Sequence, residues 1–224
     1  IGTQAGYNNR GRENTFLGFN AGFGASGTDL TGIENTGLGT ATLTYNNTGR
    51  SNTAVGLGAL YANRTGRANI GVGVRALLSN NTGSNNVAMG DSALFDNISG
   101  NVNIAIGSYA LHNNVASANN AIGNSALRSF TAGGSTYNVA VGDSAATNLV
   151  TGSNNVVMGS WAFKDHTSGS RNTAIGNFAM GERESGNDNT AVGEGSLWNT
   201  NADLNTGIGK YAGLTNITGT SNTF

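Results

Sequence analysis

Asn52-Thr53-Ala54-Val55-Gly56 is the clearest copy of a five-residue phrase that returns along the whole chain. Its glycine marks thirteen copies, with seven spacings of 17 residues, three of 16, and two of 21 and 19. A fixed period of about 20 residues is typical of stacked repeats, in which each repeat contacts its two neighbours. The phrase therefore predicts one elongated repeat domain over residues 1–224.

The composition fits such a stack better than a globule with a thick core. The chain has 36 Gly, no Pro, no Cys and only 10% charged residues, with a net charge of −1. This charge gives no reason to expect binding to nucleic acid or to an anionic membrane, and no apolar run is long enough for membrane insertion. Because the chain begins and ends inside a repeat, we expect it to be a fragment of a longer fibre.

Residue types alternate within the phrase. The residue before the marker glycine is aliphatic or Met in every copy, the residue two positions earlier is often β-branched, and a small residue stands between them. Alternation with period two predicts a short strand with one face in a core. We expect the aliphatic and β-branched positions, such as Val55 and Thr53, to point inward. The Ala-Leu pair that follows the marker, as in Ala59-Leu60, is expected to form the opposite wall.

Asparagine begins the phrase in copy after copy. Equivalent residues of a β-stack lie about 4.8 Å apart, so their amides can form a hydrogen-bonded ladder along the axis. We predict a structural ladder of Asn52, Asn69, Asn86, Asn103, Asn119, Asn138, Asn155, Asn172, Asn189 and Asn205. Thr-Gly and Ser-Gly pairs upstream of the phrase, such as Thr65-Gly66, predict corners at which glycine takes a positive φ.

These patterns together predict an all-β fold, a β-solenoid or β-roll of about 13 coils with ~17 residues per coil. A coil of this length with glycine corners leaves no room for a helix of useful length beside a strand. The two longer spacings contain residues 22–30 and 128–134, which we expect to be loops at corners. We therefore favour a β-solenoid over a helical repeat.

The phrase and the Ala-Leu pair resemble the repeats of known fibrous proteins. The copy Thr82-Gly83-Ser84-Asn85-Asn86-Val87-Ala88-Met89-Gly90-Asp91-Ser92-Ala93-Leu94 is similar to the head repeats of YadA-like trimeric autotransporter adhesins, and more so to repeats of phage and prophage tail fibres. The resemblance covers essentially the whole chain and implies a homotrimeric fibre that binds a cell surface. The coils are longer here than in the adhesin heads, so coil handedness does not carry over.

Catalytic chemistry finds little support in the sequence. His112 and His166 lie three coils apart and cannot share a site within one chain, and without Cys neither predicts a metal centre or a nucleophile triad. Asp165 and Glu182 share a register position in adjacent coils, a spacing that retaining glycosidases use, but a solvated corner explains them more simply. We predict no enzyme activity, no metal and no cofactor.

Four aromatic residues stand two positions after the marker glycine, where side chains are expected to point outward: Tyr109, Trp161, Phe178 and Tyr211. An exposed aromatic stripe suits sugar rings, so these residues are the candidate ligand-binding site; burial between subunits of a trimer is the alternative. Five Asn-x-Ser/Thr sequences match the glycosylation pattern, but they all fall at one register position, and turn chemistry explains them.

The sequence thus predicts a non-enzymatic structural fibre segment, a phage or phage-like tail-fibre shaft or head that positions or contributes to attachment to a host cell surface. The expected partners are further copies of the chain, as a homotrimer or an end-to-end filament, and a cell-surface glycan or receptor; the expected location is a virion tail or the extracellular surface of a cell. A bacterial adhesin, an extracellular filament and a glycan-degrading tailspike are the alternatives. An ice-binding solenoid is disfavoured because recurring threonines such as Thr53, Thr173 and Thr190 are expected to point inward.

Overall fold

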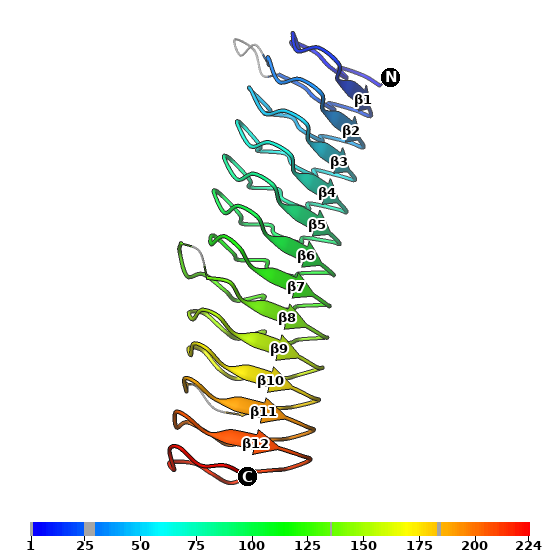
Figure 1. The fold of residues 1–224 in the computed structure, drawn as a ribbon. Helices are drawn as coiled ribbons and strands as arrows, with labels where there is room; N and C mark the ends of the chain where they lie inside the picture. Colours follow the sequence, from blue (N-terminus) through cyan, green and yellow to red (C-terminus); the bar gives the residue numbers. More distant parts are fainter. Residues whose placement is uncertain (1, 25–29, 135, 183–184) are drawn as a thin grey trace.

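The computed structural model describes residues 2–24, 30–134, 136–182 and 185–224, and shows a straight stack of coils (Figure 1). Each copy of the phrase from Gly18 onward contributes one strand of three residues, and no helix occurs in the described residues. The strands are β1 Thr15–Leu17, β2 Thr36–Leu38, β3 Thr53–Val55, β4 Ile70–Val72, β5 Val87–Met89, β6 Ile104–Ile106, β7 Asn120–Ile122, β8 Val139–Val141, β9 Val156–Met158, β10 Thr173–Ile175, β11 Thr190–Val192 and β12 Thr206–Ile208.

All twelve strands form one parallel sheet in sequence order, β1 to β12. Equivalent positions of the phrase pair with each other, so Thr53 lies opposite Ile70, and Val55 opposite Val72. The same register continues through the two longer spacings, because β1 pairs with β2 and β7 with β8 without a slip. The prediction of a β-solenoid with about 17 residues per coil is therefore confirmed, with about 11 turns between the first and last strands.

The extra residues of the longer spacings lie outside this register. Residues 128–134 form a wider loop at the corner of the coil between β7 and β8, as expected (Figure 1). Within the loop, the Gly134 carbonyl still accepts the Ser117 backbone N–H, at 2.7 Å. Most of the expected loop at 22–30 lies outside the described residues, which there include only 22–24 and Leu30.

The two faces of the sheet are the reverse of our expectation. The central residue of each strand is the one that points inward, so Ala54, Ala88 and Ala105 have no exposed surface. The flanking β-branched and aliphatic residues point outward, and Ile104 and Ile106 are 38% and 37% exposed. The prediction that Thr53 and Val55 face the core was wrong. The sheet contributes its central residues to the core, and these are mostly small.

The core is filled from the opposite wall. Ala59 and Leu60, and their equivalents in other coils, have no exposed surface and belong to one continuous apolar cluster. Each leucine of the pair has a positive φ, about 51° at Leu60, which turns its side chain across the coil toward the sheet. A Cβ added at Gly71 in the centre of β4 would already lie 3.4 Å from Leu60 Cγ. The strand centre is accordingly Ala or Gly in every strand except β1 and β9, where it is Phe16 and Val157.

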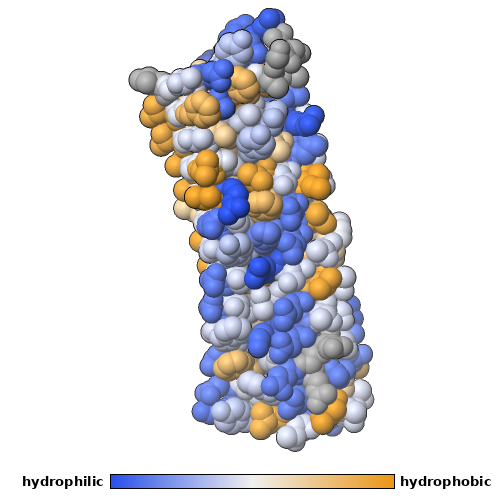
Figure 2. Space-filling model, turned by 180° about the vertical axis from the view of Figure 1, so that it is seen from behind, coloured by the Kyte–Doolittle hydropathy of each residue, from blue (hydrophilic) through white to orange (hydrophobic). Residues whose placement is uncertain are grey.

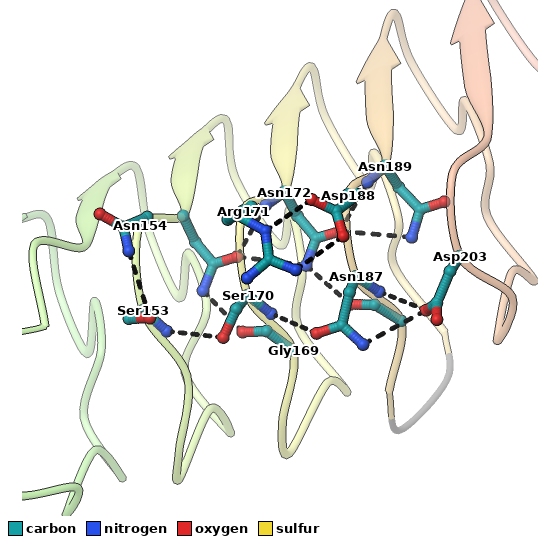
Figure 3. Close-up of polar contacts among 12 residues, drawn as sticks. Ser153, Asn154, Gly169, Ser170, Arg171, Asn172, Asn187, Asp188, Asn189 and Asp203 are labelled. Carbon is teal, nitrogen blue, oxygen red and sulfur yellow. Dashed lines mark hydrogen bonds and ion pairs between the residues drawn. The ribbon is translucent and has the colours of Figure 1, made fainter.

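The asparagines that begin the phrase form a ladder through most of the stack. Asn86 is fully buried and donates from Nδ2 to Asn69 Oδ1 at 3.1 Å and to the Gly100 carbonyl at 2.8 Å. Its Oδ1 accepts the backbone N–H of Asn103 at 2.9 Å. Figure 3 shows the same pattern at Asn172 and Asn189. Each side chain thus joins its own coil to the coils on both sides.

A second buried asparagine ladder runs beside the first, and it was not predicted from the sequence. It consists of Asn46, Asn63, Asn80, Asn97 and Asn114. The Gly83 carbonyl joins the two ladders, because it accepts from Asn69 at 2.8 Å and from Asn80 at 3.0 Å. Four of these residues begin Asn-x-Ser/Thr sequences. Their amide nitrogens are buried and engaged in hydrogen bonds, so the folded chain cannot carry a glycan on them.

The corner glycines also differ from the expectation in the first half of the stack. Gly66 does not have a positive φ. It is required for space instead, because an added Cβ would lie 2.3 Å from both Asn63 Oδ1 and the Gly83 carbonyl oxygen. Gly152 and Gly169 in later coils do have the predicted positive φ, 140° and 134°.

We predict that Asn86→Ala lowers the free energy of unfolding by about 2–4 kcal/mol. The substitution removes three hydrogen bonds and leaves buried polar partners unpaired, which costs about 1–3 kcal/mol per group. Chemical denaturation measures the loss. Asn81→Ala is the matched control, since that side chain makes no hydrogen bond within the described residues. Equal effects of the two substitutions would show that the ladder adds nothing specific to stability.

Candidate functional surfaces

The outer sheet face is an uncovered apolar surface that follows the described strands along the stack. We define it as the first and third residues of strands β1–β12, none of which is charged. The third position is occupied only by Leu, Val, Met and Ile. The residues more than a third exposed at that position are Leu17, Leu38, Met89, Ile106, Ile122, Met158, Ile175 and Ile208. The face therefore carries an aliphatic row along the full length of the stack.

A concave feature lies at the edge of this face. Val87 and Ile104 of the face, together with Val102 and Tyr137 outside it, line a groove of about 500 Å³. Val102 and Tyr137 are 58% and 60% exposed, which is unusual for large apolar side chains in one place. The groove extends the apolar surface beyond the strands.

The reverse side of the rod differs in character. Figure 2 shows hydrophilic residues running down the middle of that side, and hydrophobic residues gathering mainly toward its edges. Exposed apolar residues also occur outside the outer sheet face, for example Leu57 and Ile98, but on the outer sheet face they recur without a charge in strand after strand, as expected for a surface that another chain covers.

The threonines of the phrase lie on the outer sheet face, so the argument made against ice binding was wrong. Thr53, Thr173 and Thr190 are partly exposed at the first strand position. The first position is threonine only in β1–β3 and β10–β12, and the six strands between them carry Ile, Val or Asn there. The outward threonines therefore form two short runs separated by six strands without threonine at this position, and not a continuous array.

The four candidate aromatic residues do not form an exposed stripe. Tyr211 is 48% exposed, whereas Tyr109, Trp161 and Phe178 are half-buried. Two of them contact neighbouring side chains. The Phe178 ring centroid lies 4.9 Å from that of Trp198, and Lys164 Nζ lies 5.0 Å from the Trp161 ring centroid. Only Trp161 and Phe178 occupy neighbouring coils. The structure therefore gives no continuous aromatic platform for a sugar chain.

The residues considered for catalysis do not line the groove beside Val102 and Tyr137. Asp165 accepts a hydrogen bond from Asn148 at 3.2 Å and lies 3.9 Å from Lys164 Nζ, while Glu182 is exposed. No group of His, Asp and Glu suited to a metal ion occurs among the described residues. His112 stacks on Phe95, with ring centroids 5.0 Å apart.

Among the described residues, His166 is the one buried titratable side chain, and its burial was not predicted from the sequence. It has no exposed surface and stacks on Phe163, with ring centroids 3.9 Å apart. Neither ring nitrogen makes a hydrogen bond of ordinary geometry with a described residue. Burial lowers the pKa of His166 to about 3, and the nearby Met180 backbone acts in the opposite direction. The imidazole is therefore neutral in the fold, at a register position that asparagine occupies in earlier coils.

This burial predicts a loss of stability in mild acid. Because the pKa of His166 is lowered from 6.5 to about 3, the unfolded chain binds a proton that the folded chain excludes throughout that window. Stability is full above the unfolded pKa, and the free energy of unfolding falls by about 1.4 kcal/mol per pH unit below it, or roughly 2 kcal/mol at about pH 5. Denaturation midpoints at several pH values measure the effect.

His166→Leu is the matched variant, since Leu149 occupies the same position one coil earlier and is fully buried. Its stability is expected to be nearly independent of pH over the upper part of the window. If the variant retains the acid sensitivity of the natural chain, groups other than His166 cause it.

Polar side chains link successive coils along one corner (Figure 3). Ser170 Oγ accepts the Ser153 N–H at 3.1 Å, Asn187 Oδ1 accepts the Ser170 N–H at 3.0 Å, and Asp203 Oδ1 accepts the Asn187 N–H at 2.7 Å. Beside them, Arg171 pairs with Asp188 through two contacts of 2.6 and 2.7 Å, which holds the pKa of Asp188 below its usual value. In this part of the corner, the charged groups are paired and the N–H donors are hydrogen-bonded within the chain.

Comparison with protein-family models, curated proteins and solved structures finds no match to this chain. None of the described segments forms a helix of the length and hydropathy needed to cross a membrane. The function must therefore be argued from the surfaces of the solenoid itself.

Proposed function

We propose that this chain is a non-enzymatic segment of a homotrimeric fibre, the shaft or head of a phage or phage-like tail fibre that positions or contributes to binding of a host cell surface. The observation that carries the proposal is the outer sheet face, an exposed row of aliphatic residues that continues without a charge through twelve strands. Exposed apolar surfaces of this extent on a soluble chain mark contacts with other proteins. The face is straight and repetitive, so identical copies can cover it along its whole length.

A closed assembly of identical chains buries the same face on each copy. The threefold number comes from the resemblance to trimeric fibre repeats. The groove beside Val102 and Tyr137 supports a close contact, because a convex apolar side chain of a neighbouring copy can enter it. Burial of these side chains in a trimer would remove from water the apolar surface that a single chain leaves open.

The proposed setting is a virion tail or the extracellular surface of a cell. Buried amide ladders tie every coil to the next in the first half of the stack, so the rod holds its shape without Cys. A bacterial adhesin uses the same surfaces and differs only in the parent protein. An end-to-end filament would instead stack the first coil of one copy on the last coil of another, in which residues 222–224 pair with β12.

The molar mass in solution tests the proposal. Light scattering coupled to size exclusion, over a concentration series, is expected to give three times the 22.6 kDa of one chain at all concentrations. A single-chain mass would overturn the fibre assembly, and a mass that rises steadily with concentration would favour the filament. Release of reducing sugar from envelope polysaccharide would identify a tailspike and contradict the non-enzymatic role.

A further inference from the structure

Arginines gather in one part of the stack without acidic partners. Residues 35–90 contain four arginines and no Asp or Glu, in a chain whose net charge is −1. Arg75 lies 4.0 Å from Asp91, but Arg50, Arg64 and Arg67 have no carboxylate within ion-pair distance among the described residues. This differs from the later coils, where Arg171 is fully paired.

Two of these arginines line an open groove of about 270 Å³ at the corner of the coil. Its lining consists of Arg50 and Arg67 with Thr48, Thr65, Thr82 and Ser84. These residues form two rows, one at each of two register positions, across three consecutive coils. Neighbours within a row lie one coil apart along the axis, about 4.8 Å. None of the six belongs to the outer sheet face.

The internal hydrogen bonds of the corner explain why the guanidinium groups are available. Ser84 Oγ accepts the Arg67 N–H at 3.1 Å, and Asn101 Oδ1 accepts the Ser84 N–H at 2.8 Å. Arg50 and Arg67 occupy the same register position in two adjacent coils. In the next two coils this position carries the shorter Ser84 and Asn101, whose side chains link one coil to the next. Both arginine side chains are exposed. Two like charges one coil apart repel each other, and an anion placed between them removes that repulsion.

The chemistry of the groove selects the class of ligand. Guanidinium groups bind carboxylate, sulfate and phosphate through paired N–H donors. Threonine hydroxyls can donate to and accept from sugar hydroxyls. No aromatic ring lines the groove, so it lacks the stacking platform that single-stranded nucleic acids use.

We propose that the Arg50–Arg67 groove binds an acidic polysaccharide that runs along the solenoid axis, with its anionic groups on the two guanidiniums and its hydroxyls on the threonines. The proposal deepens the role in surface attachment proposed above and rests on it for the polysaccharide as ligand. It places the binding on a polar corner and not on the four aromatic residues.

Isothermal titration with two acidic probes tests the proposal. Polygalacturonate fragments supply carboxylate groups, and sulfated dextran supplies sulfate groups. Unsubstituted dextran measures the neutral background. Arg50→Gln/Arg67→Gln is expected to weaken binding of the preferred acidic probe about tenfold or more, because it removes both charged donors. The control, Arg75→Gln/Arg128→Gln, removes the same charge outside the groove and is expected to change binding less than about twofold.

Several results would overturn the proposal: no binding of either acidic probe, equal weakening by both double variants, or tighter binding of an oligonucleotide of matched charge. Both variants alter exposed side chains, and unchanged denaturation midpoints would establish that they fold. The mass of the natural chain, measured in the same samples, separates this proposal from the previous one. A trimer that binds no acidic polysaccharide would contradict the groove alone, and a single chain that binds it would contradict the trimer alone.

Discussion

Ile106→Lys/Ile122→Lys is expected to convert the proposed three-chain particle into single chains. Both residues lie in the aliphatic row of the outer sheet face, 37% and 41% exposed, in the adjacent strands β6 and β7. In a single chain their side chains already meet water, so the substitutions are expected to change its stability little. In a trimer, symmetry places six lysines in an apolar interface, and each unpaired buried charge costs several kcal/mol.

Ser99→Lys/Thr151→Lys is the matched control, because it adds the same charge at exposed corner positions away from the outer sheet face. This control is expected to keep the mass of the natural chain. Light scattering and the unfolding midpoint distinguish the outcomes. If Ile106→Lys/Ile122→Lys keeps a threefold mass, the chains associate through another surface, and the aliphatic row no longer supports the proposed assembly.

The position of that surface could have been deduced from the sequence, and the reason it was missed is physical. The period of the phrase was sufficient to predict the coil length, the β-solenoid and the first asparagine ladder. The orientation of the strand was inferred from hydrophobicity, which placed Thr53 and Val55 inside. Alternation gives the opposite answer: Asn52 and Ala54 share a face, and a buried amide ladder at Asn52 requires Ala54 to be inside with it.

Other features depended on packing that the sequence alone does not reveal. The second ladder, at Asn63 and Asn80, occupies a position that later coils fill with Phe130, Leu149 and His166, so no single rule covers the position. The burial of His166 follows from its stacking on Phe163. The arginine groove needs the register of three coils to bring Arg50 and Arg67 side by side, although the absence of acidic residues from 35–90 is visible in the sequence.

Gly107→Ala is expected to be the most destabilising single substitution considered for this chain. Gly107 is a marker glycine with φ of 132°, a region that is essentially restricted to glycine. An added Cβ would lie 2.4 Å from the Gly123 carbonyl oxygen in the next coil, and backbone cannot yield without separating the two coils. Strain at such a φ costs about 1–3 kcal/mol, and the collision adds to it, so we expect a total loss of about 4 kcal/mol or more.

Gly209→Ala separates the two causes, because Gly209 has nearly the same φ, 125°, but an added Cβ there would meet no atom within 4 Å. This variant is expected to lose only the strain, about 1–3 kcal/mol. Denaturation gives the total losses, and hydrogen exchange shows whether the loss at Gly107 extends into the coils on both sides, as nearest-neighbour coupling in a solenoid requires. Equal losses of unfolding free energy at Gly107 and Gly209 would mean that the positive φ alone requires glycine at the marker position. A much larger loss at Gly107 would mean that the close approach of successive coils also selects it, which gives a reason for its return in every copy of the phrase.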